Sequence, residues 1–588
     1  MGVIIRSRPR NHSVLYFTRS ADGPITRFLN IVHLQCAPMK FRSCFLFLAF
    51  ISSLLSPAFG SAYQNRPKLI VVIVIDQFRG DYLERYYDKF GEGGFRLLMD
   101  HGANFTDCRY DYANTRTAPG HATLFSGAYS DGHGIAGNEW WDPVLRKVVT
   151  SVEDDHYETL KPGGSQEIGT SPHNLMADTI GDELKLATAG KSRVFGISMK
   201  DRASIFPAGY SGNAGYWIDR IDGLWVSSSY YMKALPQWVV DFDASGPGKK
   251  YLNQEWKGPD GTVLDNTAPA TNSTGQPLGF YDLVGKTPFA NDYELDFVKE
   301  LIKQEKLGSG PTTDLLSISL SANDILGHKV GPNDPKMAAM ALALDRQLAE
   351  FFGFLKQQVG LDNVWIALSA DHGIAPLVDD AQAMRIPGGY LDESSMAQQI
   401  NQRLTARFPQ VTGGPRCLRP EDAKRTNREG TPDFVAWMTW PIAYLCKDDF
   451  DVAKVGEAEA EQLVGDTFKQ VAFLRAVYTR TQLTRGTLPA TPYSEQYLHS
   501  ISAYGGWYVV GQPAPFFIGS PSGTDHSTPY NYDAHVPLAF YGAPFKPGTY
   551  RGHSEPVDMV ATFSALLGIE RPTHSIGRVL TEALTTSR

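Results

Sequence analysis

Cysteine is scarce in this chain, which has 5 cysteines in 588 residues and no CxxC pair. That scarcity excludes a zinc finger or ribbon built on thiolate ligands, so any metal would be held by oxygen and nitrogen donors. Cys417 and Cys446 lie in the same region and are candidates for a disulfide, whereas Cys108 is expected to be a buried small residue.

Clusters of positive charge and a second long apolar segment are also absent. The net charge is −8 and Lys and Arg are dispersed, which argues against nucleic acid as a partner because binding to a phosphate backbone needs a basic surface. Beyond residue 62, no stretch could cross a membrane. The apolar content of 42% and the charged content of 20% are typical of a globular protein, and the length suits one large α/β domain with insertions.

The N-terminal region has the pattern of a secretory signal peptide. Residues 39–42 are a short basic segment, residues 44–55 are apolar, and residues 58–62 offer small side chains for cleavage. A transmembrane anchor is the alternative, but spanning a bilayer takes about 18 or more apolar residues, and this run is shorter. We therefore expect residues 39–62 to be a signal peptide and the protein to be exported, to a periplasm or outside the cell. Residues 1–38 have no periodicity and are interpreted as an extension from an upstream start codon chosen in error.

Strand-like runs alternate with helical patterns along the rest of the chain, which predicts an α/β fold with a mostly parallel central sheet flanked by helices. Asp334-Pro335 has the form of an N-cap followed by proline, and apolar residues then recur at helical spacing to Leu355, so a helix is expected to cover the sheet here. Residues 205–290 and 381–520 show little periodicity and are interpreted as irregular insertions that form a cap. Their aromatic residues are expected to be packing residues.

These patterns divide the chain into an ordered series of parts, with no internal repeat. After the extension (1–38) and the signal peptide (39–62), the expected parts are a first core segment (66–204), an insertion (205–290), a second core segment (291–380), an insertion or cap (381–520) and a third core segment (521–588).

Asp and His side chains follow several of the predicted strands, at the point where each strand ends. They are Asp76 after residues 69–75, Asp324 and His328 after residues 315–320, and Asp371 and His372 after residues 364–368. In an open α/β sheet, ligands bind outside the carboxyl ends of the strands, so these side chains are expected to converge. Carboxylates and imidazoles brought together suit a pair of Zn²⁺-like ions, and two such ions imply a displacement at phosphorus.

Short motifs in a fixed order carry a resemblance to a known family. They are Val74-Ile75-Asp76-Gln77, Thr117-Ala118-Pro119-Gly120-His121, His133-Gly134-Ile135-Ala136-Gly137-Asn138, Lys200-Asp201-Arg202, Asn323-Asp324 with His328, Ala370-Asp371-His372-Gly373, and His526 ahead of Tyr530-Asn531-Tyr532-Asp533. The chain resembles the alkaline phosphatase superfamily, in the branch of type I phosphodiesterases and nucleotide pyrophosphatases. Within that branch it is most similar to the single-chain bacterial alkaline phosphatases of the PafA type.

The resemblance implies a role for each residue of the site. One zinc ion would be held by Asp324, His328 and His526, and a second by Asp76, Asp371, His372 and the oxygen of Thr117. Thr117 would be the nucleophile and would form a phospho-threonine intermediate, at the start of a helix whose free N–H groups favour an anion. Asn138, Lys200 and Arg202 would bind the phosphate oxygens, with the last two projecting the same way from an extended segment.

The expected function is therefore that of a secreted, zinc-dependent alkaline phosphatase with two Zn²⁺ per chain. It would hydrolyse small-molecule phosphate monoesters, and a monomer is favoured. A phosphodiesterase or nucleotide pyrophosphatase is the alternative, although those enzymes lack the Lys-x-Arg pair. A non-catalytic binding protein with the same fold ranks last, and the C/S-x-P-S-R motif of arylsulfatases is absent around Thr117.

Four further residues need an interpretation of their own. His535 competes with His526 as a ligand, but it immediately precedes the apolar residues 536–540, so a structural role is favoured. Thr115 is the alternative nucleophile. His121 and His133 are expected to be structural or to support the ligands from behind.

Overall fold

The most apolar run of the chain forms the strand around which the fold is built. All seven residues of β1 (Leu69–Ile75) are buried. A strand that is apolar on both faces must be covered on both faces, and parallel sheets, which have helices on both sides, provide this. In the computed structural model, β1 pairs in parallel with β12 (Asp314–Leu320) and with β13 (Val364–Ser369). The carboxyl ends of the three strands therefore lie side by side.

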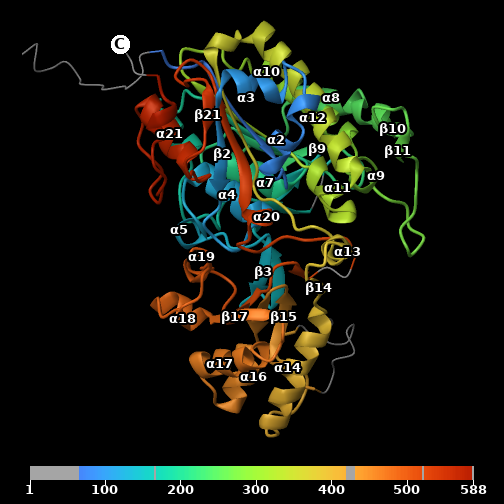
Figure 1. The fold of residues 1–588 in the computed structure, drawn as a ribbon, viewed down its shortest axis with the longest axis vertical. Coiled ribbons are helices and arrows are strands. Elements are labelled where there is room, and N and C mark those ends of the chain that lie inside the picture. The colour runs from blue at the N-terminus through green and yellow to red at the C-terminus, as the bar shows by residue number, and fades with distance from the viewer. Residues whose placement is uncertain (1–64, 165–166, 419–430, 520–521, 586–588) are drawn as a thin grey trace, which may run out of the picture. The chain divides into compact units, whose positions relative to one another are not determined.

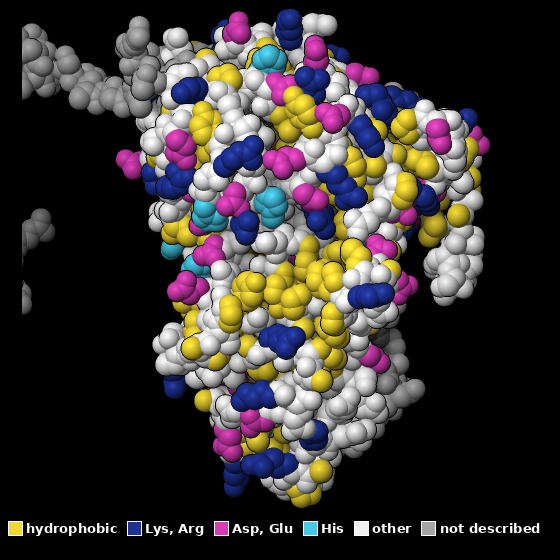
Figure 2. Space-filling model, viewed as in Figure 1, with side chains coloured by type: hydrophobic (Ala, Val, Ile, Leu, Met, Phe, Trp, Pro, Cys, Tyr) yellow, Lys and Arg dark blue, Asp and Glu magenta, His cyan; other side chains and the backbone are white. Residues whose placement is uncertain are grey.

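The structure describes residues 65–164, 167–418, 431–519 and 522–585 (Figure 1). The expected extension and signal peptide lie outside these residues. No helix within the described ranges has both the length and the apolar character needed to span a bilayer. Figure 2 shows positive and negative side chains interspersed on one face of the molecule, as the dispersed charge of the sequence predicts.

The central sheet has 11 strands among the described residues, in the order β21-β2-β20-β13-β1-β12-β7-β8-β9-β5-β6. Its middle, from β13 to β8, is parallel, and antiparallel pairs lie on both sides. The remaining strands are β2 (Ala103–Arg109), β5 (Glu153–Leu160), β6 (Ile168–Thr170), β7 (Val194–Ser198), β8 (Ala214–Ile218), β9 (Trp225–Ser228), β20 (His535–Tyr541) and β21 (Gly548–Tyr550). The predicted α/β class with a mostly parallel sheet is confirmed.

Helices lie on both sides of this sheet (Figure 1). One packed group is α3 (Phe95–His101), α10 (Pro288–Gln304) and α12 (Pro335–Gln358), and another is α4 (Thr117–Ser126), α7 (Asp201–Ala208) and α21 (Asp558–Leu567). Shorter helices are α2 (Asp81–Arg85), α5 (Ser130–His133), α6 (Ile180–Ala187), α8 (Gln237–Ala244), α9 (Phe280–Val284), α11 (Ala322–Val330), α13 (Val378–Ala383) and α20 (Asn531–Ala534). The predicted start of α12 is confirmed, because the Asp334 side chain accepts a hydrogen bond from the Lys336 N–H.

Residues 205–290 are more regular than the sequence predicts. β8 and β9 extend the central sheet, and only β10 (Glu255–Lys257) and β11 (Val263–Asn266) form a separate hairpin. The first residues of β8 are Ala-Gly, and small residues give little strand signal in the sequence. The aromatic residues do pack: Trp225 stacks on Phe297 of α10 with ring centroids 3.9 Å apart.

Residues 381–520 also form a regular unit rather than the expected irregular cap. Four strands make an antiparallel sheet in the order β15-β16-β18-β17, with its own apolar core. The elements are β15 (Val435–Thr439), β16 (Ile442–Leu445), β17 (Leu474–Thr479), β18 (Tyr508–Pro513), α14 (Glu393–Arg407), α16 (Lys447–Ala453), α17 (Glu457–Phe468), α18 (Arg480–Arg485) and α19 (Ser494–Leu498), and β14 (Gly389–Tyr390) pairs with β19 (Phe517–Ile518). Cys417 and Cys446 form a disulfide in this unit, and Cys108 is free and buried in the core.

This unit, called the cap from here on, packs on the hairpin of β3 (Glu139–Asp142) and β4 (Lys147–Thr150). Trp140 stacks on Tyr504 of the cap, with ring centroids 5.1 Å apart and an angle of 10° between the planes. One apolar cluster contains buried residues of both parts, so the cap is joined to the core by a shared hydrophobic interior.

Candidate active site

The carboxyl ends of β1 and β13 bring three predicted ligands together. Asp76 directly follows β1, Asp371 and His372 follow β13, and all three side chains are fully buried. The His372 Nε2 lies 3.6 Å from the Asp76 Oδ1 and 3.6 Å from the Asp371 Oδ2. None of these three atoms has a hydrogen-bond partner among the residues that the structure describes. Because unpartnered buried polar atoms are costly, this group fits a divalent cation that all three would bind.

A second group follows β12. Asp324 and His328 lie on one face of α11, four residues apart, with the Asp324 Oδ1 3.2 Å from the His328 Nε2. His526 comes from the loop before α20, and ligand atoms of the three residues lie within 4.8 Å of one another. The His526 ring stacks on His372, with centroids 3.8 Å apart, so the two groups are neighbours.

All three imidazoles are oriented in the same way. Each has its Nδ1 against a backbone carbonyl, which fixes the proton on Nδ1 and leaves Nε2 as the lone-pair donor. The partners are the Gly373 oxygen for His372 at 2.9 Å, the Thr524 oxygen for His328 at 2.9 Å and the Thr115 oxygen for His526 at 2.6 Å. This tautomer is the one that a metal-binding histidine needs.

Lys200 joins the two groups. Its Nζ is 2.5 Å from the Asp76 Oδ2 and 2.7 Å from the Asp324 Oδ2, and the lysine side chain is 5% exposed. Burial lowers the pKa of Lys200, but the charges of Asp324 and Asp76 outweigh that effect and raise it above its usual value. The lysine is therefore a fixed cation between the two groups.

The acidic groups show how much negative charge is concentrated here. Burial, and then the charge of Asp76, raise the pKa of Asp371 well above its usual range. Burial also acts to raise the pKa of Asp324, but Lys200 and His328 outweigh it and hold that pKa well below its usual range. One lysine thus stabilises some, but not all, of the carboxylates in their charged form.

Thr117 is the first residue of α4 and is 2% exposed. No hydrogen bond of its hydroxyl is found within the described ranges. The Thr115 hydroxyl, in contrast, donates to the Thr528 oxygen at 3.0 Å and accepts from the Ser527 and Thr528 N–H groups. Thr115 is thereby committed to holding the loop that carries His526, which favours Thr117 as the reacting group.

Asn138 directly precedes β3, and its side chain contacts the start of α4. Its Oδ1 accepts a hydrogen bond from the Ala118 N–H at 2.8 Å. The sequence predicts that this N–H is free for an anion, but in the structure it is not. The contact leaves the Asn138 amide nitrogen as the donor available to a ligand. Glycine is needed at position 120 of α4, because a Cβ on Gly120 would lie 2.4 Å from the backbone oxygen of Asp371.

The sequence predicts that Lys200 and Arg202 project from one extended segment, and this prediction is wrong. Lys200 caps α7, and Arg202 is already inside that helix. Arg202 is partly exposed and its ion pair with Asp201 is 3.5 Å long. Within the described part of the chain, its Nε is buried without a hydrogen-bond partner. The structure therefore places the two cations at the carboxyl end of β7, with Lys200 inside the site and Arg202 still able to bind an anion.

Three histidines outside the two groups have other partners. The His535 Nε2 lies 3.0 Å from the Thr106 oxygen. His121 contacts the Thr117 oxygen and the Ser319 hydroxyl, both at 2.8 Å, and burial lowers its pKa to about 4. These contacts match the structural roles expected for both residues. Another predicted structural residue, His133, contacts the Thr123 hydroxyl at 3.1 Å.

Gln77 supports both groups and was not predicted to have a role. Its N–H donates to the Asp371 Oδ1 at 3.0 Å, and its side-chain amide donates to the Asp324 Oδ1 at 2.6 Å. It adopts a left-handed backbone conformation with a φ of 63°, which is uncommon for a residue with a side chain. Its place directly after Asp76 is the only sequence signal for this role.

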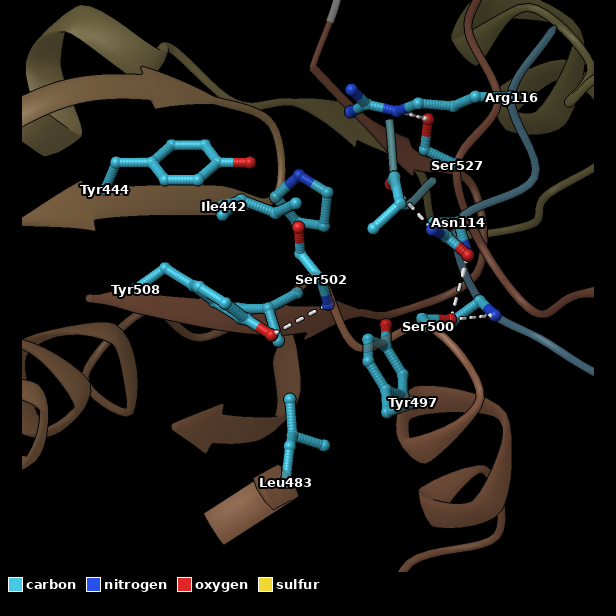
Figure 3. Close-up of a pocket in the computed structure, with 14 residues that line it drawn as sticks. Asn114, Arg116, Ile442, Tyr444, Leu483, Tyr497, Ser500, Ser502, Tyr508 and Ser527 are labelled. Atoms are coloured by element: carbon cyan, nitrogen blue, oxygen red, sulfur yellow. Dashed lines mark hydrogen bonds between the residues drawn. The ribbon is translucent and has the colours of Figure 1, made fainter. Parts of the chain in front are cut away.

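Arg116 connects the Thr117 segment to the cap. Figure 3 shows it at a cavity that is lined by Asn114 from the core and by Ile442 and Tyr444 from the cap. The Arg116 Nε donates to the Ser527 hydroxyl at 2.7 Å (Figure 3), and its Nη2 donates to the Trp440 oxygen of the cap at 2.5 Å. One side chain thus ties the cap to the residue beside His526.

Comparisons with known proteins place these features in context. The profile of the family described as type I phosphodiesterase / nucleotide pyrophosphatase matches residues 70–429. The chain is 33% identical to the alkaline phosphatase PafA of Elizabethkingia meningoseptica, over 88% of this chain and 95% of that protein. It is 33% identical to the alkaline phosphatase PhoV of Synechococcus elongatus, over 88% and 93% of the two chains. A protein of Myroides odoratus named calcium-transporting ATPase is 31% identical, over 88% and 95%.

A solved structure gives the same picture for the fold. The crystal structure of wild-type alkaline phosphatase PafA superposes with a TM-score of 0.78 and 30% identity, covering 88% of this chain and 99% of that one. The core and the cap of the present chain are therefore both within the matched length.

Lys200→Met tests whether the lysine stabilises the site. Removing its charge leaves Asp76 buried without a cation and Asp324 with His328 alone, which should lower the free energy of unfolding by about 3–5 kcal/mol in the presence of a chelator. Urea unfolding measures the change. The control is Arg202→Met, whose ion pair is partly exposed and should matter by less than about 1 kcal/mol. Equal losses in the two variants would contradict the account.

Proposed function

Because the chain belongs to the type I phosphodiesterase / nucleotide pyrophosphatase family, we propose that it is an alkaline phosphatase that hydrolyses phosphate monoesters at this site. The observation that carries the proposal is the meeting of two Asp/His groups at the carboxyl ends of parallel strands, with Lys200 between them. The identity to two named alkaline phosphatases over most of the chain supports the same activity.

Two zinc ions are the proposed cofactors. The donors are three carboxylates and three imidazoles, without a thiolate, and each imidazole presents Nε2. Imidazole donors favour zinc over magnesium or calcium, which prefer oxygen ligands. When bound, two such ions would act as Lewis acids that lower the pKa of a hydroxyl and stabilise negative charge on oxygen.

Thr117 is the proposed nucleophile. Its hydroxyl proton passes to solvent and its Oγ forms a bond to phosphorus, while the bond from phosphorus to the leaving oxygen breaks and that oxygen takes a proton from water. Water then attacks the phosphorus and gives up a proton, the bond to Thr117 Oγ breaks and Oγ regains a proton, and inorganic phosphate leaves. The backbone around Thr117 is fixed for this step by the contact of its carbonyl with His121 and by the contact of Ala118 with Asn138.

Asn138, Lys200 and Arg202 are the proposed ligands of the phosphate oxygens. A monoester presents three non-bridging oxygens and one more negative charge than a diester. Lys200 supplies a point charge between the two Asp/His groups. The Arg202 Nε, which has no hydrogen-bond partner among the described residues, can donate to an anionic oxygen. In a diester one of these oxygens carries an alkyl group and cannot use the same contacts, so this set favours monoesters.

Export to a periplasm or to the outside of the cell remains part of the proposal. The signal-peptide pattern at residues 39–62 supports it, and so does the Cys417–Cys446 disulfide, because disulfides persist in oxidising compartments. We take the protein to act as a monomer, since one chain supplies every proposed ligand.

The phospho-threonine intermediate can be trapped directly. Rapid acid quenching during turnover should leave phosphate on the peptide that contains Thr117, and mass spectrometry locates it. Thr117→Ser should retain activity because it keeps a hydroxyl, whereas Thr117→Ala should lose it. The matched control Thr115→Ser should leave the label on Thr117. Phosphate on Thr115 would show that the wrong residue has been assigned.

Selectivity for monoesters tests the substrate class. Lys200→Ala/Arg202→Ala should lower kcat/KM for a phosphate monoester by at least about a hundredfold, because preorganised donors to the transferred oxygens are lost. Hydrolysis of a diester by the same preparation should change much less, so the ratio of the two is independent of zinc content. Lys329→Ala, an exposed cation beside His328, is the control and should leave the ratio unchanged. Equal losses on both substrates would favour the phosphodiesterase alternative.

A further inference from the structure

The two Asp/His groups of the candidate active site meet through one pair of histidines. His372 of the first group and His526 of the second have ring centroids 3.8 Å apart, with an angle of 25° between the planes. In the part of the chain that the structure describes, no hydrogen bond joins these two side chains. Their separation therefore depends on how the two loops that carry them are held together.

Asp533 holds the loop of His372 through its backbone. The Gly373 N–H donates a hydrogen bond to the Asp533 backbone oxygen at 2.6 Å, and the Gly373 oxygen lies 2.9 Å from the His372 Nδ1. Glycine is needed at this position, because a Cβ on Gly373 would lie 2.3 Å from the backbone oxygen of Tyr532. The residue that orients the His372 ring is therefore in direct contact with α20.

The side chain of Asp533 holds the loop of His526. Its Oδ2 accepts hydrogen bonds from the Thr528 hydroxyl at 2.5 Å and from the Thr528 N–H at 3.1 Å. Ser527, which lies between His526 and Thr528, has a φ of 92°. This conformation is uncommon for a residue with a side chain, and it persists where neighbouring contacts fix it. The Asp533 carboxyl supplies two of these contacts.

Stability alone does not explain a carboxyl at this position. The Asp533 side chain is fully buried, and its Oδ1 has no hydrogen-bond partner within the described ranges. An unpartnered oxygen in the interior costs free energy, and burial raises the pKa of Asp533 well above its usual range. An apolar side chain would avoid this cost, but it could not accept the two hydrogen bonds from Thr528.

We propose that Asp533 is a positioning residue that sets the place of His526 relative to His372, and thereby the affinity of the second group for metal. This proposal rests on the proposed two-metal function. The backbone oxygen of Asp533 reaches the loop of one group and its carboxyl reaches the loop of the other, so one residue links the two. Removing a partner that orients a metal ligand from behind commonly weakens metal affinity by about 10–100-fold.

Zinc binding to the metal-free full chain, measured by competition with a chromophoric chelator, tests the proposal. Asp533→Ala releases Thr528, while the His526 Nδ1 keeps its contact with the Thr115 oxygen. One binding event should therefore weaken by at least about tenfold rather than disappear. Asp533→Asn keeps an oxygen that can accept from Thr528 and should bind zinc nearly as the unmodified chain does. Thr528→Val removes the hydroxyl donor and should weaken the same event to a smaller extent.

The matched control is Asp558→Ala, which removes another buried acid. Asp558 accepts hydrogen bonds from the Glu555 N–H at 3.0 Å and from the Arg578 N–H at 2.8 Å. It has no hydrogen bond or ion pair with a candidate metal ligand among the described residues. Its loss should lower stability without changing the affinity for zinc. Circular dichroism without zinc checks that each variant is folded.

A double variant shows whether Asp533 acts through His526. His526→Ala identifies the binding event that belongs to the second group, and adding Asp533→Ala to it should change the remaining zinc affinity by less than about twofold. A tenfold further loss in the double variant would show a general structural effect and would overturn the proposal. So would an equal loss of zinc affinity in Asp558→Ala.

Unchanged zinc binding by Asp533→Ala also overturns the proposal and leaves the two-metal function intact. If Asp533→Ala does not fold, Thr528→Val decides, and unchanged zinc binding by that variant has the same consequence. Absence of zinc binding by the unmodified chain would instead overturn the two-metal function, and this proposal with it.

Discussion

The concentration of buried negative charge at the carboxyl ends of β1, β12 and β13 is the constraint on which the site depends. Asp76, Asp324 and Asp371 lie together in a region from which water is largely excluded. One lysine bridges two of them, and unpartnered oxygens remain on Asp76 and Asp371. Such an arrangement persists only if cations compensate for it, so the fold and the proposed metal chemistry have the same physical origin.

The surrounding structure holds these groups in place from several directions. Gln77 donates to Asp371 and Asp324, while backbone carbonyls fix the three imidazoles. The cap contributes through Arg116, which binds both the Trp440 oxygen and the serine next to His526. Movements of the cap would therefore displace the segment that carries His526, although the cap itself supplies no candidate ligand.

The sequence predicts the parts of the site that follow regular strands. An uninterrupted apolar run such as Leu69–Ile75 predicts a buried parallel strand, and the residue after it is then at the rim. The cap strands escaped prediction because register shifts in β15 and β17 interrupt their two-residue period. The contact of Lys200 with Asp76 and Asp324, and that of Arg116 with Trp440, join residues more than a hundred positions apart. A pattern in one sequence carries no signal for such pairs.

The central claim is that two metal ions compensate for this charge. Diffraction data collected from zinc-loaded crystals on both sides of the zinc absorption edge test it most directly. The account predicts one anomalous peak bounded by Asp324, His328 and His526, and a second bounded by Asp76, Asp371 and His372. Density for Lys200 still paired with Asp76 and Asp324, with no anomalous peak at either group, would contradict it.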